Sequence, residues 1–119
     1  MSKDNIQQEL HSAFSNHQAG NLTRAAELYR EVLKSDPDNT HALHYLGVIE
    51  AGAGNFKSAK SLMARSLSSQ PTNVPYLENY ATILCQAGDY QSALQACQEG
   101  LQLAPRSASL LYVSATSLM

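Results

Sequence analysis

Four histidines fall in the first half of the chain, and their imidazole side chains could bind a metal ion: His11, His17, His41 and His44. His41 and His44 are three residues apart, so a helix would place them on one face, and His11 could lie across from them. A metal site needs convergent imidazoles held by further partners, yet no acidic or thiolate partner stands nearby. We therefore expect a partly exposed polar surface here instead of a metal site.

Two cysteines, Cys85 and Cys97, could supply a nucleophile. A catalytic thiol needs an activating base beside it, and every histidine lies much earlier in the chain. The stretch 52–57 superficially looks like a phosphate-binding loop, but no strand precedes it and the Gly-Lys-Ser/Thr ending is missing. The sequence thus predicts no catalytic residue, no cofactor and no metal, and we do not expect an enzyme.

The bulk composition indicates a single folded domain. The chain has 119 residues with 44% hydrophobic and 15% charged residues, and its formal net charge of −2 predicts no binding to nucleic acid. No apolar run approaches the ~20 residues of a membrane span, and the N-terminus lacks the apolar core of a signal peptide. Two cysteines are too few for a disulfide framework. We expect a cytoplasmic protein that does not bind membranes.

The dominant pattern is a repeat of 34 residues, because the same residue types return at that spacing three times. The coinciding sets are Gly20, Gly54 and Gly88; Ala25, Ala59 and Ala93; Leu33, Leu67 and Leu101; and Pro37, Pro71 and Pro105. A fixed period between about 20 and 50 residues is typical of solenoids built from stacked units.

Each unit is predicted to contain two antiparallel helices, A and B. In the first unit, helix A is expected from Ile6 to Ala19, and Gly20 ends it. The expected caps of the B helices are Asn21, Asn55 and Asp89, and those of the following A helices are Asn39, Asn73 and Ser107. Small residues mark the places where paired helices approach closely, at Ala13, Gly47, Ala81 and Ala115 on A and at Ala25, Ala59 and Ala93 on B.

The spacing of Gly47, Gly54, Phe56, Ala59, Leu67 and Pro71, echoed in the flanking units, resembles the tetratricopeptide repeat. The resemblance implies an all-α, right-handed superhelical solenoid of antiparallel helix pairs with about seven helices. Its repeats would span about 6–39, 40–73 and 74–107, with a partial fourth repeat over 108–119, all in one domain. The first helix carries Ser12 and Asn16 where apolar residues are usual in the family, so we expect it to be looser than the others or packed against something else.

In this family the A helices line a concave surface, and the resemblance implies that a protein or peptide partner binds there. The partner-binding residues expected by register are His11, Phe14, His41, His44, Tyr45, Glu78, Asn79, Thr82 and Tyr112. The carboxylate clamp of chaperone-binding members needs Lys, Arg and Asn, but only Asn79 fits, because Leu10, Phe14, Tyr45 and Pro75 occupy the other positions. We expect a neutral or mildly basic partner, with Glu78 available to a cation.

The C-terminal stretch carries no charge from Ser107 to Met119. Solenoids usually end on a helix with a polar outer face, so this stretch predicts either the N-terminal module of a longer protein or a self-association surface. The residues expected in such a homo-oligomer contact are Leu110, Leu111, Val113, Leu118 and Met119. The favoured function is an interaction scaffold that binds a partner segment in its groove; the alternative is an assembly element acting through this helix.

Overall fold

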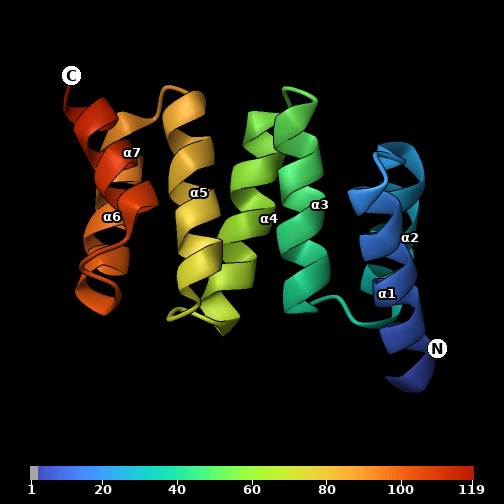
Figure 1. Ribbon diagram of the computed structural model, residues 1–119. Helices are drawn as coiled ribbons and strands as arrows, with labels where there is room; N and C mark the ends of the chain where they lie inside the picture. Colours follow the sequence, from blue (N-terminus) through green and yellow to red (C-terminus); the bar gives the residue numbers. More distant parts are fainter. Residues whose placement is uncertain (1–2) are drawn as a thin grey trace.

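The computed structural model describes residues 3–119, which form seven α-helices and no strand. In chain order the helices are α1 (Lys3–Gln18), α2 (Leu22–Ser35), α3 (Thr40–Gly52), α4 (Phe56–Ser69), α5 (Val74–Gln86), α6 (Tyr90–Leu103) and α7 (Ala108–Leu118). They stack side by side as three antiparallel pairs followed by the single helix α7 (Figure 1). The predicted all-α repeat fold is confirmed.

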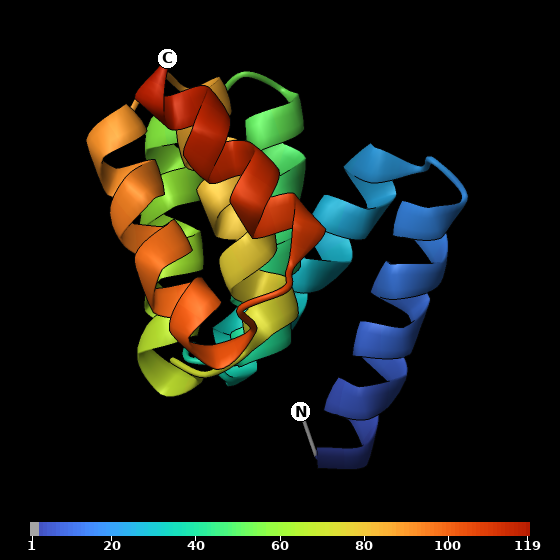
Figure 2. The same ribbon diagram turned by 60° about the vertical axis from the view of Figure 1, so that its left-hand side comes forward.

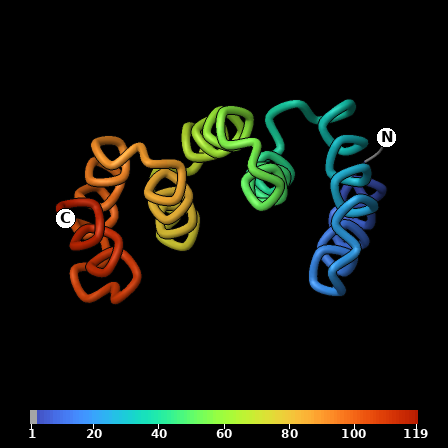
Figure 3. Tube along the Cα trace, turned by 90° about the horizontal axis from the view of Figure 1, so that it is seen from above, coloured from blue at the N-terminus to red at the C-terminus, as the bar shows by residue number. Residues whose placement is uncertain are grey.

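The stack bends into an arch, with α3 and α5 on its inner side and α4 and α6 on its outer side (Figure 3). Neighbouring pairs meet where α2 packs on α3, α4 on α5 and α6 on α7. The A helices of successive repeats therefore face the hollow of the arch.

The first helix begins earlier than predicted, at Lys3 instead of Ile6, and ends at Gln18 instead of Ala19. Apolar periodicity starts only at Ile6, so the hydrophobic pattern carries no signal for the polar first turn. Asp4 in that turn favours the helix because its negative charge lies at the positive end of the helix dipole.

The three corner glycines adopt the backbone conformation that the repeat pattern predicts for them. Gly20, Gly54 and Gly88 have φ angles of +83°, +86° and +81°, a region that other residues rarely occupy. Each A helix therefore ends in the same way before the chain turns into its B helix.

The capping predictions are confirmed for the A helices and for one B helix. The side chains of Asn39, Asn73 and Ser107 accept hydrogen bonds from the backbone N–H groups of Ala42, Tyr76 and Leu110, and Asp89 accepts one from Ser92.

The capping prediction is wrong for Asn21 and Asn55, whose side chains make no capping bond. Their side-chain amides instead donate hydrogen bonds to residues of the preceding A helix. Asn21 donates to Asn16 Oδ1 at 3.3 Å, and Asn55 donates to Glu50 Oε2 at 3.2 Å. A polar acceptor near the end of the preceding A helix competes with the capping bond at these two corners.

Small residues allow the paired helices to cross closely. Ala13, Ala25, Ala59, Ala81 and Ala93 are fully buried. At Gly47, an added Cβ atom would lie 2.5 Å from Met63 Cγ and 3.2 Å from the carbonyl oxygen of Ala59. Even one methyl group at position 47 would therefore push α3 and α4 apart.

The apolar face of α7 is partly inside the core, which corrects the predicted self-association surface. Leu110 and Val113 are buried against α5 and α6, so they are not available to a second copy. Gly100 makes room for Leu110, whose Cδ1 lies 2.5 Å from where a Cβ at position 100 would stand. Leu111, Leu118 and Met119 remain exposed.

Helix α1 stands apart from α3, whereas its partner α2 packs on α3 (Figure 2). Within residues 3–119, α1 packs on α2 but lacks the direct packing on α3 that α5 has on α7. Ser12 and Asn16 are polar where α5 carries Tyr80 and Leu84, and Ala13 is the one buried residue of α1. The space between α1 and α3 is bridged by aromatic side chains.

Candidate partner-binding groove

A cluster of aromatic rings links the first three repeats, with Tyr45 of α3 at its centre. The Tyr45 ring meets Phe14 of α1 edge to face at a centroid distance of 5.6 Å and stacks on Tyr29 of α2 at 6.0 Å. It also meets His44 at 5.0 Å and Tyr76 of α5 at 6.0 Å, both edge to face. Offset and edge-to-face pairs at these distances are favourable, so the cluster connects the first pair to the rest of the arch.

His44 lies inside this cluster and not on the groove surface. Its side chain is fully buried, and its ring stacks in parallel on Tyr76 with centroids 3.6 Å apart. The side-chain amide nitrogen of Asn79 lies 3.0 Å from His44 Nε2. With Nε2 accepting a hydrogen bond from this amide, the ring proton of His44 is on Nδ1. Burial, together with the nearby imidazoles of His41 and His17, lowers the pKa of His44 to about 4. The prediction that His44 contacts a partner is therefore wrong: this imidazole is a neutral core group.

Tyr76 is a structural member of the cluster that the sequence reasoning missed. Its ring is buried, and its hydroxyl forms a hydrogen bond with His41 Nδ1. Burial raises the pKa of Tyr76 well above that of free tyrosine, so the phenol stays protonated. The residues at the same register in the flanking units, Ala42 and Leu110, are apolar, and this is the sequence signal that could have identified Tyr76, although Gln8 of the first unit is polar and exposed.

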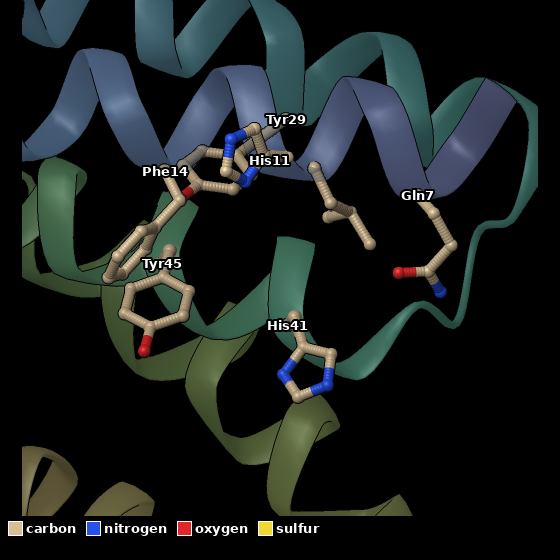
Figure 4. A pocket seen from close by; sticks show the side chains of 7 residues that line it. Gln7, His11, Phe14, Tyr29, His41 and Tyr45 are labelled. Carbon is tan, nitrogen blue, oxygen red and sulfur yellow. The ribbon is translucent and has the colours of Figure 1, made fainter. Parts of the chain in front are cut away.

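A pocket of about 290 Å³ opens between α1, α2 and α3. Its lining residues are Gln7, Leu10, His11, Phe14, Tyr29, His41 and Tyr45. Figure 4 shows these side chains converging on the pocket from the three helices, with Gln7 at one end and Phe14 and Tyr45 at the other. Four of the predicted partner-binding residues are thus brought together, and none of the seven lining residues carries a formal charge.

The second half of the groove is formed by α5 and α7. Thr82 donates through its hydroxyl to the backbone carbonyl of Glu78 at 2.8 Å. The Glu78 carboxylate accepts a 2.7 Å hydrogen bond from the hydroxyl of Ser107, the residue that caps α7. Glu78 therefore fixes the start of α7, a role that sequence reasoning did not assign to it.

Tyr112 of α7 is strongly exposed, with 74% of its surface accessible. It borders a broad hollow of about 560 Å³ together with Thr82, Cys85, Tyr90 and Val113. Tyr112 and the α1–α3 pocket therefore lie toward opposite ends of the groove.

The structure brings together no catalytic arrangement from the candidate residues. Cys97 is buried, which raises the pKa of its thiol, and Cys85 is half-buried. No group of three metal-binding side chains occurs among residues 3–119. At the 52–57 loop, Glu50 holds the amide of Asn55, and its carboxylate would repel a phosphate there.

No helix in the described part of the chain is long and apolar enough to cross a membrane.

The sequence model of one family, described as tetratricopeptide repeat, matches residues 17–83, which is more than half of the chain. Comparison with curated proteins found no match. A mutant of the O-GlcNAc transferase of Thermobaculum terrenum is similar in structure, with a TM-score of 0.87 and 24% identity over 99% of this chain and 23% of that chain.

Two further structures show the same fold. MamA AMB-1 has a TM-score of 0.83 and 21% identity, over 98% of this chain and 64% of that one. The first TPR of Spaghetti (RPAP3), bound to an HSP90 peptide, has a TM-score of 0.88 and 11% identity. The match covers 99% of this chain and 96% of that one. This chain thus spans about a quarter of the transferase and just under two thirds of MamA.

Proposed function

The chain belongs to the tetratricopeptide repeat family, whose fold serves protein interaction and is generally non-enzymatic, and on that premise we propose that its concave groove binds a polypeptide segment of a partner. The observation that carries the proposal is the neutral pocket between α1, α2 and α3, which lies on the concave side and is walled by aromatic rings. Aromatic side chains with polar tips bury a large contact area at little entropic cost, as binding surfaces require.

The groove chemistry argues against an acidic partner segment. One structural neighbour is bound to an HSP90 peptide. In this chain the positions where a carboxylate clamp needs Lys, Arg and Asn are otherwise occupied by Leu10, Phe14, Tyr45 and Pro75. Asn79, the one matching residue, is engaged by His44. A buried carboxylate without a compensating cation is strongly unfavourable, so the proposed partner segment is neutral or basic.

A peptide-display selection tests this proposal directly. We expect the chain to enrich a family of related peptides, and we expect Tyr45→Ala and Tyr112→Ala together to weaken their binding by more than about 1 kcal/mol. Leu103→Ala is the control, because Leu103 is an exposed apolar residue at the end of the outer helix α6. Equal affinity of the double variant and the control would remove the groove from the proposal.

A second candidate function is self-association through α7, with a contact reduced to Leu111, Leu118 and Met119. Leu111 is 50% and Leu118 is 72% exposed, and large exposed apolar residues on one short helix favour a contact. Sedimentation of Leu111→Glu/Leu118→Glu beside the unmodified chain tests it. An oligomer that the double variant loses supports the contact, and a strict monomer at high concentration rejects it.

The proposal extends to a module role and a location. The match to only 23% of the transferase chain is consistent with an N-terminal interaction module of a larger protein. Two free thiols, Cys85 and Cys97, support the predicted cytoplasmic location, because reducing compartments keep thiols unpaired.

A further inference from the structure

We propose that the pocket between α1, α2 and α3 receives an arginine side chain of the bound segment. This inference deepens the proposed groove function and rests on it. It concerns the kind of side chain that the first half of the groove selects, which neither the fold nor the family match specifies.

Three aromatic rings from three different helices wall the pocket. Phe14 of α1 stands edge to face with Tyr45 of α3, at an interplanar angle of 69°, while Tyr29 of α2 stacks nearly parallel to Tyr45 at 18°. Tyr29 is only 1% exposed and lies against Tyr45, so the accessible ring surface of the pocket comes from Phe14 and Tyr45 (Figure 4). Ring faces carry negative electrostatic potential and attract a guanidinium or ammonium group.

The polar lining groups favour a ligand that forms hydrogen bonds. The Gln7 amide and a neutral His11 ring each offer both a donor and an acceptor. A purely apolar side chain would cover these groups without pairing them, which is unfavourable. An arginine offers five N–H donors on an aliphatic stem, and Leu10 lies beside the rings to contact that stem.

Charge and size agree with the same side chain. None of the lining residues is a lysine or arginine, so the pocket holds no permanent positive charge that would repel a cation. A volume of about 290 Å³ lies at the lower limit of small-molecule sites, so the pocket suits one long side chain better than a cofactor. A planar guanidinium also stacks on ring faces more effectively than the compact, strongly hydrated lysine ammonium.

An NMR titration with matched fragments tests the inference. The probes are N-acetyl-arginine amide, its uncharged isostere N-acetyl-citrulline amide, and N-acetyl-phenylalanine amide, each added to the ¹⁵N-labelled chain. We expect arginine to shift the signals of α1 and α3 around Phe14 and Tyr45, with an affinity at least about threefold higher than that of citrulline. Equal affinities for arginine and citrulline, stronger binding of phenylalanine, or no shift with arginine would each overturn the proposal.

Two variants locate the effect. Phe14→Leu keeps an apolar group at a position that is 41% exposed, so it should fold normally and reduce the arginine preference over citrulline at least twofold. Leu103→Ala, on the outer helix α6 and away from the groove, should leave that preference unchanged. An undiminished preference in Phe14→Leu, or a loss in Leu103→Ala, would contradict the assignment.

The result is separable from the groove proposal. If display selection enriches groove-dependent peptides that lack arginine, the groove function stands and the arginine assignment fails. If the selection fails while the fragment preference holds, the pocket assignment stands and the polypeptide-binding proposal fails.

Discussion

The first and third repeats share the glycine, alanine, leucine and proline positions of the 34-residue repeat, but they pack in different ways. In α1 only Ala13 is buried, whereas α5 buries five residues, including Leu77 and Leu84. α5 packs directly on α7, while α1 reaches α3 through the rings of Phe14 and Tyr45. The glycine and alanine positions thus determine how a helix pair folds on itself, whereas the A helices differ in how closely they pack on the next A helix. The pocket lies beside α1, the helix that buries only Ala13.

Replacing the residue at the same repeat position by alanine in both regions should give the largest difference in the free energy of unfolding. Leu84→Ala removes a fully buried side chain in α5 and should lower the free energy of unfolding by about 2–5 kcal/mol. Asn16 occupies the same position two repeats earlier and is only half-buried, so Asn16→Ala should change stability by about 0.5 kcal/mol or less. Urea denaturation of both variants measures the difference, and similar losses would show that α1 is as tightly packed as α5.

Acidification should weaken the junction between the two regions through His44. Because folding lowers its pKa from 6.5 to about 4, the unfolded chain binds the proton more tightly than the folded chain. The full stability from this group is present above pH 6.5 and is lost as the pH falls toward 4, by roughly 3 kcal/mol in total.

Urea unfolding between pH 7 and pH 4 measures this loss, with His44→Gln as the comparison. That variant cannot titrate at position 44, so its stability should decline less steeply over the same range. Parallel curves for the two proteins would mean that other groups cause the acid sensitivity.

The smallest expected difference in stability is between the residues that precede the B helices, Asp89 in the third repeat and Asn21 in the first. Asp89 caps α6 and also pairs with Lys60 at 3.4 Å, so Asp89→Ala should destabilise the fold by about 1 kcal/mol. Asn21 makes no capping bond, so Asn21→Ala should lower the free energy of unfolding by only a few tenths of a kcal/mol. Thermal unfolding of the two variants compares them, and an equal cost would indicate that Asn21 caps its helix in solution.

The helix pairs could be predicted from sequence because their determinants are local. The corner conformation of Gly54 and the close approach at Gly47 follow from residue type and a fixed period. Most A-helix caps follow from one residue each. The Asn21 cap failed because its outcome depends on a competing acceptor, Asn16, that lies on the previous helix.

The site was harder to predict because burial there depends on neighbours in the next repeat. His44 shares its register with Leu10 and Tyr112, which are at least partly accessible. It is itself buried, with Tyr76 and Asn79 of α5 and its neighbour Tyr45 against its ring. Leu110 appeared exposed in sequence, but Gly100 of α6 leaves a space that it fills. Such pairings between repeats are not encoded in the periodicity of either partner.

If a partner segment lies in the groove, its protons come close to the aromatic rings. Intermolecular nuclear Overhauser effects between a selected peptide and the isotope-labelled chain detect this proximity. We expect contacts from the peptide to the ring protons of Phe14 and Tyr45. Contacts confined to the outer helices α2, α4 and α6 would show that the partner binds outside the groove.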